Sequence, residues 1–175
     1  MSEPGVADLL LTHVRDVPDW PQPGVVFKDI TPLLADARGF ARVVDALAAE
    51  TGPVDRVVGI EARGFILAAP VAYRLGSGFV PVRKQGKLPS PTLVEAYLLE
   101  YGEAVLEIRH ETLQPGDRVL IVDDVLATGG TAAAAVELVR RCGAKVVGVQ
   151  VLIELGLLGG RAQLADVPVR ALLSL

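Results

Sequence analysis

Two adjacent carboxylates, Asp123 and Asp124, follow a run of apolar, mostly β-branched residues at 119–122. A small loop of glycine and threonine comes next, at 127–131, and an alanine-rich stretch with helical character follows at 132–141. Ionised carboxylates only accept hydrogen bonds, so the pair suits two hydroxyls of a sugar. Glycines let a backbone approach an anion closely, and a helix start offers unpaired N–H groups and the positive end of its dipole. This order of strand, acidic pair, loop and helix predicts a site for a sugar phosphate.

The composition of this loop and the adjacent carboxylate pair limit the kinds of ligand that the site could bind. It lacks the lysine of a Walker-type phosphate loop, which argues against an ATPase. A carboxylate pair beside a phosphate would repel a bare nucleotide, but it is compatible with the hydroxyl end of a sugar and a Mg²⁺ ion. The alternative is a solvated Asp-Asp turn that happens to precede a helix.

A second candidate anion loop lies at 60–65, again between an expected strand and an expected helix. Arg63 can contact a pyrophosphate with two parallel hydrogen bonds, and Gly64 allows close backbone approach. By itself the segment could equally be an ordinary helix start. Its place one strand–helix unit before the acidic pair favours a ligand with two phosphate groups.

A basic loop and a hairpin supply the remaining candidates. Arg83, Lys84 and Lys87 fall within five residues. Such a run is often only solvated, but here we expect a mobile loop that closes over a pyrophosphate leaving group. In the hairpin, Glu100 lies between Leu99 and Tyr101. Desolvation there would raise the pKa of this carboxyl and let it relay a proton, whereas a solvent-facing glutamate is the alternative.

The hydrophobic pattern predicts the elements that hold these residues. Strands alternate with helices, which is typical of an α/β fold with a mainly parallel sheet flanked by helices. We expect residues 1–175 to form a single domain, with 1–35 and 84–108 as appendages. The predicted helices are 6–14, 38–50, 64–75, 132–141 and 160–164; the strands are 56–60, 78–83, 119–122, 145–153 and 169–173; a hairpin at 93–101 and 104–108 turns at 102–103; residues 16–24 are irregular and 24–32 extended.

Composition excludes several classes of protein. A net charge of −4 does not favour nucleic-acid binding, and no apolar run reaches the length of a membrane span. The N-terminus has no basic region typical of a signal peptide. The single cysteine, Cys142, rules out a disulfide framework and predicts a structural thiol in a cytoplasmic setting. One cysteine and two separated histidines do not form a metal-ligand cluster.

The motif at 122–131 resembles the 5-phosphoribosyl-1-pyrophosphate (PRPP) motif of the type I phosphoribosyltransferases. Segments 23–34 and 99–102 are similar to the adenine phosphoribosyltransferase branch of that family, and 61–65, 82–89 and 153–161 extend the resemblance over nearly the whole chain. The resemblance implies a type I phosphoribosyltransferase fold with a mainly parallel five-stranded sheet, an N-terminal hood and a mobile hairpin. It implies transfer of 5-phosphoribose from PRPP to adenine N9, giving AMP and pyrophosphate, by a Mg²⁺-dependent homodimer.

The resemblance also implies a role for each matching residue. Asp123 and Asp124 would bind the ribose hydroxyls, and Ala127, Thr128, Gly129, Gly130 and Thr131 would surround the 5′-phosphate. Arg63, Lys84, Lys87 and Tyr101 would contact pyrophosphate, Phe27 and Val125 would enclose the purine, and Val26 and Lys28 would bind its edge through the backbone. Glu100, Arg63 and Lys87 would be catalytic, and Mg²⁺ would be held mainly through PRPP rather than by direct protein ligands.

Three residues depart from the common family pattern, namely Lys28 for arginine, Ser90 for glycine and Val125 for leucine; none removes a catalytic group. Two alternatives remain: a 6-oxopurine phosphoribosyltransferase on the same fold, and a non-catalytic sensor of PRPP or purines. A sensor that regulates transcription would need a DNA-binding domain or a basic face. The length and net acidity of the chain do not favour either feature.

Overall fold

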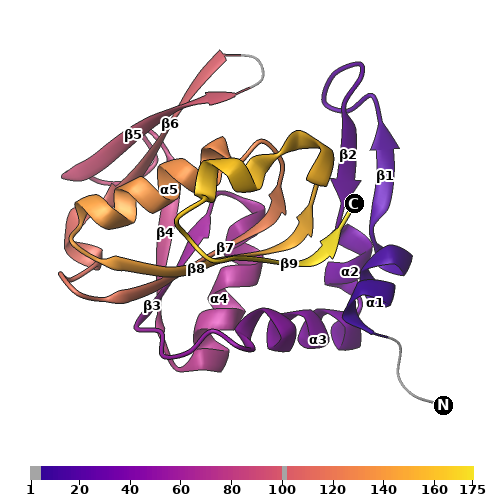
Figure 1. Ribbon diagram of the computed structural model, residues 1–175, viewed down its shortest axis with the longest axis horizontal. Coiled ribbons are helices and arrows are strands. Elements are labelled where there is room, and N and C mark those ends of the chain that lie inside the picture. Colours follow the sequence, from indigo (N-terminus) through magenta and orange to yellow (C-terminus); the bar gives the residue numbers. More distant parts are fainter. Residues whose placement is uncertain (1–4, 100–101) are drawn as a thin grey trace.

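A seven-stranded sheet forms the centre of the computed structural model, which describes residues 5–99 and 102–175 (Figure 1). Five adjacent strands are mutually parallel, as predicted, and an antiparallel hairpin extends one edge of this parallel part. Along the sheet the strands are β5 (Thr92–Leu99), β6 (Gly102–Arg109), β4 (Gly78–Lys84), β3 (Arg56–Ile60), β7 (Arg118–Leu126), β8 (Lys145–Glu154) and β9 (Val169–Ser174).

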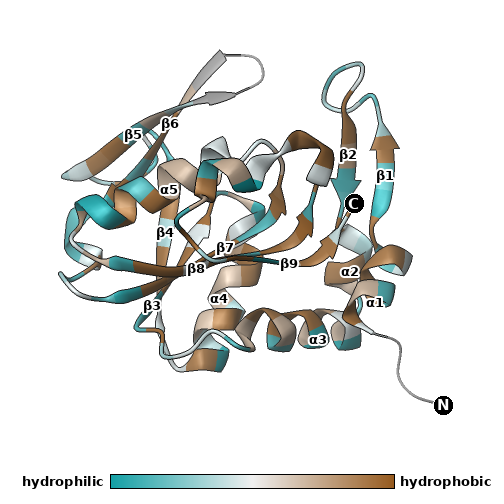
Figure 2. Cartoon of the chain, viewed as in Figure 1, coloured by the Kyte–Doolittle hydropathy of each residue, from teal (hydrophilic) through white to brown (hydrophobic). Residues whose placement is uncertain are grey.

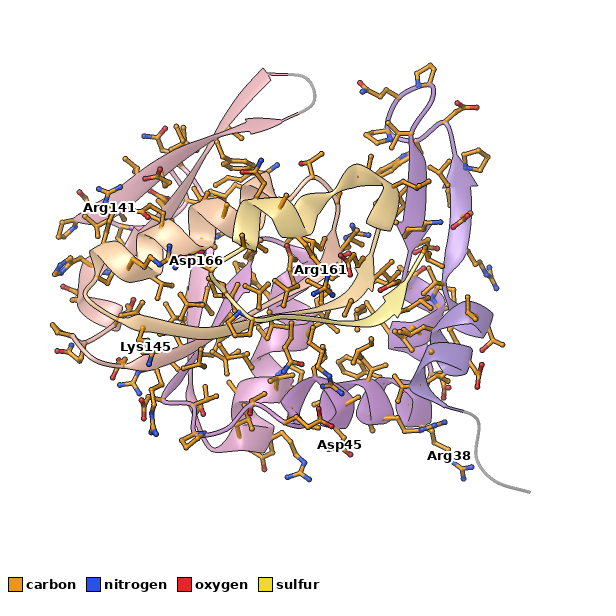
Figure 3. All side chains as sticks on the ribbon, viewed as in Figure 1. Arg38, Asp45, Arg141, Lys145, Arg161 and Asp166 are labelled. Carbon is orange, nitrogen blue, oxygen red and sulfur yellow. The ribbon has the colours of Figure 1, made fainter. Side chains whose placement is uncertain are left out.

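Helices cover both faces of this sheet, and each interface is apolar. One face packs against α5 (Gly130–Arg141), and the other against α3 (Ala37–Ala48) and α4 (Arg63–Leu75). Alternate residues of the buried strands face the two layers, so β3 and β7 are apolar on both sides. Figure 2 shows this apolar colouring along the central strands. Charged residues of α3, such as Arg38 and Asp45, lie on its outer side (Figure 3).

The hairpin at the sheet edge forms where it was predicted, but its turn does not. β6 pairs with β4 through Arg83 opposite Glu107, and β5 pairs with β6 along its whole length. The turn predicted at 102–103 is wrong, because Gly102 already pairs with Leu99 as the first residue of β6. Glycine content alone suggested a turn there, and the cross-strand register overrode that local preference.

The N-terminal segment forms more structure than its sequence suggested. After α1 (Val6–His13), β1 (Arg15–Pro18) pairs with β2 (Val26–Asp29), and α2 (Thr31–Ala35) follows. The prediction of irregular structure over 16–24 is therefore wrong for its first residues, and the extended prediction for 24–32 misses the start of α2. All four residues of β1 are exposed, so it lacks the apolar alternation that marks a strand.

Short 3₁₀ segments complete the chain at η1 (His110–Thr112), η2 (Gly156–Leu158) and η3 (Gly160–Leu164). The β1–β2 ribbon and the β5–β6 hairpin rise on opposite sides of the carboxyl ends of the parallel strands (Figure 1). These ends therefore carry the loops in which the candidate residues lie. Within residues 5–99 and 102–175, no helix has the length and apolar character needed to cross a membrane.

Candidate active site

The loop between β7 and α5 has the geometry expected of a phosphate site. Gly129 adopts a left-handed backbone conformation, with φ of 88°, and α5 begins at the next residue. The loop turns sharply there and leaves the first N–H groups of α5 without helical partners. A cavity of about 80 Å³ opens beside it, lined by Asp123, Val125, Leu126, Ala127, Thr128, Gly129, Thr131, Ala132 and Val151. One carboxylate and most of the candidate phosphate loop therefore share one small space.

Segment η3 supports the phosphate loop through backbone contact. A Cβ atom on Gly160 would lie 2.3 Å from the Ala127 carbonyl oxygen, and one on Gly129 would lie 2.3 Å from the Gly160 carbonyl oxygen. No side chain fits between these backbones. Arg161, which projects from η3 in Figure 3, makes a two-point contact with the buried Glu154, at 2.7 and 2.8 Å. This pair fixes η3 against the end of β8.

The two carboxylates differ in their partners. The Asp123 Oδ1 atom accepts the Asp124 N–H at 2.9 Å. Burial raises the pKa of Asp123 well above its usual value, and the charge on Asp124 raises it further. Burial also raises the pKa of Asp124, although the Arg63 guanidinium opposes this shift. The Arg63 Nη2 atom lies 2.8 Å from Asp124 Oδ2 as an ion pair, and that oxygen has no aligned hydrogen-bond donor in the described residues.

Arg63 connects this acidic pair to the N-terminal segment. Its Nη1 donates to the Lys28 carbonyl at 3.0 Å, and its Cζ atom lies 4.4 Å from the centroid of the Phe27 ring. Trp20 contacts the same ring edge-on, with centroids 4.4 Å apart. The guanidinium thus occupies one face of the aromatic ring that was predicted to contact a purine.

The end of β4, with Arg83 and Lys84, and the loop after it, with Lys87, are gathered around Glu61, whose side chain is only 8% exposed. Arg83 Nε lies 3.2 Å from Glu61 Oε2, the Lys84 N–H donates to the same oxygen at 3.0 Å, and the Lys87 ammonium contacts Oε1. Burial alone would raise the pKa of Glu61, but Lys87, the Lys84 N–H and Arg83 together lower it below its usual value. The peptide bond between Glu61 and Ala62 is cis.

Glu107, in β6, fixes the backbone of the same loop. Its Oε1 accepts the N–H groups of Lys87 and Leu88, each at 2.7 Å, and its Oε2 accepts the Thr92 hydroxyl at 3.2 Å. Burial tends to raise the pKa of Glu107, but these backbone donors lower it overall. Glu107 is 3% exposed, and its hydrogen bonds to this backbone make it a buried anchor for the loop.

A larger cavity, of about 370 Å³, lies between part of the hairpin and the start of α5. Glu95 and Tyr97 line it from β5, and Thr128 and Gly130 line it from the phosphate loop. The hairpin therefore lies over the mouth of the loop. Glu100 and Tyr101 were predicted to act from this hairpin and lie outside the described residues.

The tertiary structure brings most predicted residues to one region and shows two that the sequence reasoning missed. Asp124, Phe27 and Lys28 are linked through Arg63, while Lys84 and Lys87 lie at Glu61. Val26 is exposed beside this cluster, and Val125 lines the small cavity. Glu61 and Glu107 carried no predicted role. The sequence feature that could have indicated Glu61 is its position directly after a buried strand. No sequence feature indicates Glu107, because the alternation of polar and apolar residues around it predicts only a strand.

The carboxylates suit a metal ion that is carried mainly by a substrate. Among residues 5–99 and 102–175, no group of three or more His, Cys, Asp or Glu side chains is placed to hold a metal. Mg²⁺ commonly takes one or two carboxylates and completes its shell with water and substrate phosphates. The Asp124 Oδ2 atom is buried beside Arg63 without an aligned donor, and it fits that mode or a sugar hydroxyl once the guanidinium moves away.

Comparison with known proteins identifies the family. The phosphoribosyl transferase domain family matches residues 28–166, which is well over half of the chain. An adenine phosphoribosyltransferase of Acidothermus cellulolyticus is 62% identical over 170 residues, covering 96% of each chain. The chain is a member of the adenine phosphoribosyltransferase family.

Solved structures of this family share the fold. Adenine phosphoribosyltransferase from Rhodothermus marinus superposes with a TM-score of 0.93 at 50% identity, covering 97% of this chain and 98% of that one. The Trypanosoma brucei enzyme, solved with AMP, pyrophosphate and ribose-5-phosphate, gives a TM-score of 0.90 at 25% identity and covers 99% and 81%. The predicted type I phosphoribosyltransferase fold is confirmed.

Proposed function

We propose that this protein is a purine salvage enzyme that transfers 5-phosphoribose from PRPP to N9 of adenine, giving AMP and pyrophosphate. The observation that carries the proposal is the cavity shared by Asp123 and most of the phosphate loop, namely residues 127–129 and Thr131. A sugar phosphate needs hydroxyl acceptors and phosphate donors within one small space, and this cavity supplies both. The family membership and the ligands of the Trypanosoma brucei relative support the same assignment.

In this proposal the N–H groups at 127–131 and the hydroxyls of Thr128 and Thr131 bind the 5′-phosphate. Asp123 and Asp124 accept hydrogen bonds from the ribose hydroxyls. The Asp124 Oδ2 atom lacks an aligned donor but is ion-paired with Arg63 at 2.8 Å, so in this proposal it accepts one of them after the guanidinium moves. Mg²⁺, held mainly through PRPP, would neutralise charge at the pyrophosphate when bound, and Asp123 and Asp124 are the carboxylates near enough to the phosphate loop to assist it.

The purine is enclosed by Phe27 and Val125, and the backbone of Val26 and Lys28 binds its edge. Adenine presents an acceptor at N1 and donors at N6, whereas 6-oxopurines present the reverse. A fixed backbone edge leaves buried groups unpaired with the wrong base, which can discriminate by ~10⁴. The Lys28 carbonyl already accepts a hydrogen bond from Arg63, whose guanidinium also lies over the Phe27 ring, so adenine must share this carbonyl and displace the guanidinium from that face of the ring.

Pyrophosphate is the leaving group, and Arg63, Lys84, Lys87 and Tyr101 are proposed to contact it. The bond between C1′ and the pyrophosphate oxygen breaks as adenine N9 approaches, through an oxocarbenium-like ribosyl cation. The cations stabilise the charge that develops on the leaving oxygen. Glu100 is proposed to relay a proton at the ring nitrogen opposite the attacking one.

The same proposal includes a homodimer and a cytoplasmic location. Exposed apolar side chains on one helix and its neighbouring strand, Ile66, Tyr73 and Phe79, are available for contact with a second copy. The single cysteine is buried and does not call for an oxidising compartment. Residues 1–175 are proposed to act as one domain, with 1–35 and 84–108 as its appendages. Light scattering on the purified protein measures the assembly directly.

The deciding experiment incubates the protein with PRPP, MgCl₂ and one of four bases: adenine, guanine, hypoxanthine or xanthine. We expect AMP and pyrophosphate with adenine and at least ~10³-fold lower kcat/KM with the others. Equal or better turnover of a 6-oxopurine would assign the alternative substrate class. Binding of PRPP without any nucleotide product would assign a sensor.

A further inference from the structure

The groups around the Glu61 carboxylate resemble an anion-binding site, and Glu61 itself is the anion that fills it. Its side chain is 8% exposed, and a guanidinium, a backbone N–H and an ammonium surround it, from Arg83, Lys84 and Lys87. Two of these residues belong to the basic loop proposed to contact pyrophosphate. The protein's own carboxylate therefore holds the Lys87 cation that the product would need.

The backbone and the side chain of Lys87 are held by different partners. Glu107 accepts the Lys87 N–H at 2.7 Å and the next N–H, from Leu88, at the same distance. The Lys87 side chain is 48% exposed, and within residues 5–99 and 102–175 its ammonium forms an ion pair with Glu61 alone. Because Glu107 keeps the loop backbone in place, the ammonium can leave Glu61 by rotation of its side chain without movement of the loop.

Loss of Lys87 would not leave the buried carboxylate unpaired. Glu61 Oε2 would still accept the Lys84 N–H at 3.0 Å and face Arg83 Nε at 3.2 Å. A buried carboxylate with no partners would be costly, but one that keeps two donors is not. Two arrangements of Lys87 are thus compatible with one arrangement of the surrounding residues.

We propose that Glu61 is a positioning residue that holds the Lys87 ammonium in the absence of pyrophosphate and competes with pyrophosphate for it. This inference rests on the proposed function, because it assumes that pyrophosphate binds beside Lys87. The competition lowers the affinity for the product and so accelerates its release. It also keeps a mobile cation oriented toward the site between turnovers.

The direct test is Glu61→Gln, which keeps the size and the acceptor oxygen but removes the charge. Isothermal titration with inorganic pyrophosphate in MgCl₂ should show a Kd about tenfold lower than that of the wild-type protein, because a repelling charge has been removed and Lys87 is free. Product inhibition by pyrophosphate should strengthen in parallel. An unchanged or weaker affinity would overturn the inference.

The matched control is Asp55→Asn, which removes a carboxylate at the other end of the same strand, β3. Both carboxylate oxygens of Asp55 contact Arg118, at 2.8 Å each. Asp55 directly precedes β3 and Glu61 directly follows it, so the length of the strand lies between Asp55 and the basic loop. Its pyrophosphate affinity should stay within about twofold of wild type. A similar tightening in both variants would mean that only net charge matters and would overturn the role of Glu61.

A double-mutant cycle separates positioning from a structural role. In a Lys87→Met background, Glu61→Gln should change the pyrophosphate Kd by about threefold or less, since no ammonium remains to be released. An undiminished tenfold effect would overturn the inference. If Glu61→Gln does not fold, carboxyl ¹³C NMR of the wild-type protein replaces it: the Glu61 signal should shift on saturation with pyrophosphate, and a static signal would overturn the competition.

The outcomes also distinguish this inference from the proposed function. If the wild-type protein makes AMP but Glu61→Gln does not bind pyrophosphate more tightly, only the role of Glu61 is overturned. If the substitution tightens pyrophosphate binding but the wild-type protein makes no AMP, the proposed function is overturned and the role of Glu61 stands. If the wild-type protein does not bind pyrophosphate at all, both the proposed function and the role of Glu61 are overturned.

Discussion

Gly160→Ala tests whether η3 positions the phosphate loop. A Cβ atom there would lie 2.3 Å from the Ala127 carbonyl oxygen and 3.0 Å from the Gly129 nitrogen. Real Cβ atoms essentially never approach closer than 3.0 Å, so the loop or η3 must move by at least about 0.7 Å. Both neighbours are backbone atoms, which cannot rotate away as a flexible side chain could.

The expected magnitude follows from this displacement. A misplacement of about 1 Å in a substrate-positioning group can reduce kcat/KM by ~10²-fold. The crowding should also lower the free energy of unfolding by ~1–3 kcal/mol. Because η3 is fixed to Glu154 through Arg161, we expect the displacement to fall mainly on the loop at 127–129.

The assay measures kcat/KM for PRPP at saturating adenine and the Kd of AMP by titration calorimetry, with a thermal melt to confirm folding. Gly148→Ala is the matched control, since its Cβ would meet its nearest neighbour at an ordinary 3.5 Å. A folded Gly160→Ala variant with kcat/KM for PRPP within about threefold of wild type would refute the positioning role of η3.

Three further predictions concern single carboxylates. Asp124→Asn should weaken AMP binding by about tenfold or more with little loss of folding, because it replaces a charged acceptor for the ribose hydroxyls by a neutral amide and removes the charge that pairs with Arg63; unchanged calorimetric affinity would contradict the ribose assignment. Glu100→Leu should lower kcat by ~10²–10⁴ in the AMP assay, and near-normal turnover would remove Glu100 from the mechanism. Contacts with Arg118 lower the pKa of Asp55 in the folded state, so its stabilisation is present above the unfolded pKa and is lost as the pH falls through the folded one. Urea unfolding should therefore show the wild type more stable than Asp55→Asn at pH 7, with the difference shrinking below about pH 4; a gap that widens in acid would contradict the sign.

The sequence by itself determined the parallel sheet and the identity of the phosphate loop. Apolar runs, helical spacing and a glycine loop are properties of neighbouring residues, so 56–60 and 78–84 were predicted almost to the residue as strands. The acidic pair and the loop at 127–131 are contiguous as well. Their chemistry could be inferred before any fold was known.

Only the tertiary structure decided which distant residues meet. Arg63 reaches Lys28 across 35 residues of sequence, Lys87 reaches Glu61 across 26, and the Gly160 backbone closes on the phosphate loop from η3. No local pattern encodes these contacts, because they arise when separate strand ends converge on one edge of the sheet. Exposed β1 was missed for a related reason: its pairing with β2 stabilises it, whereas its own side chains give no strand pattern.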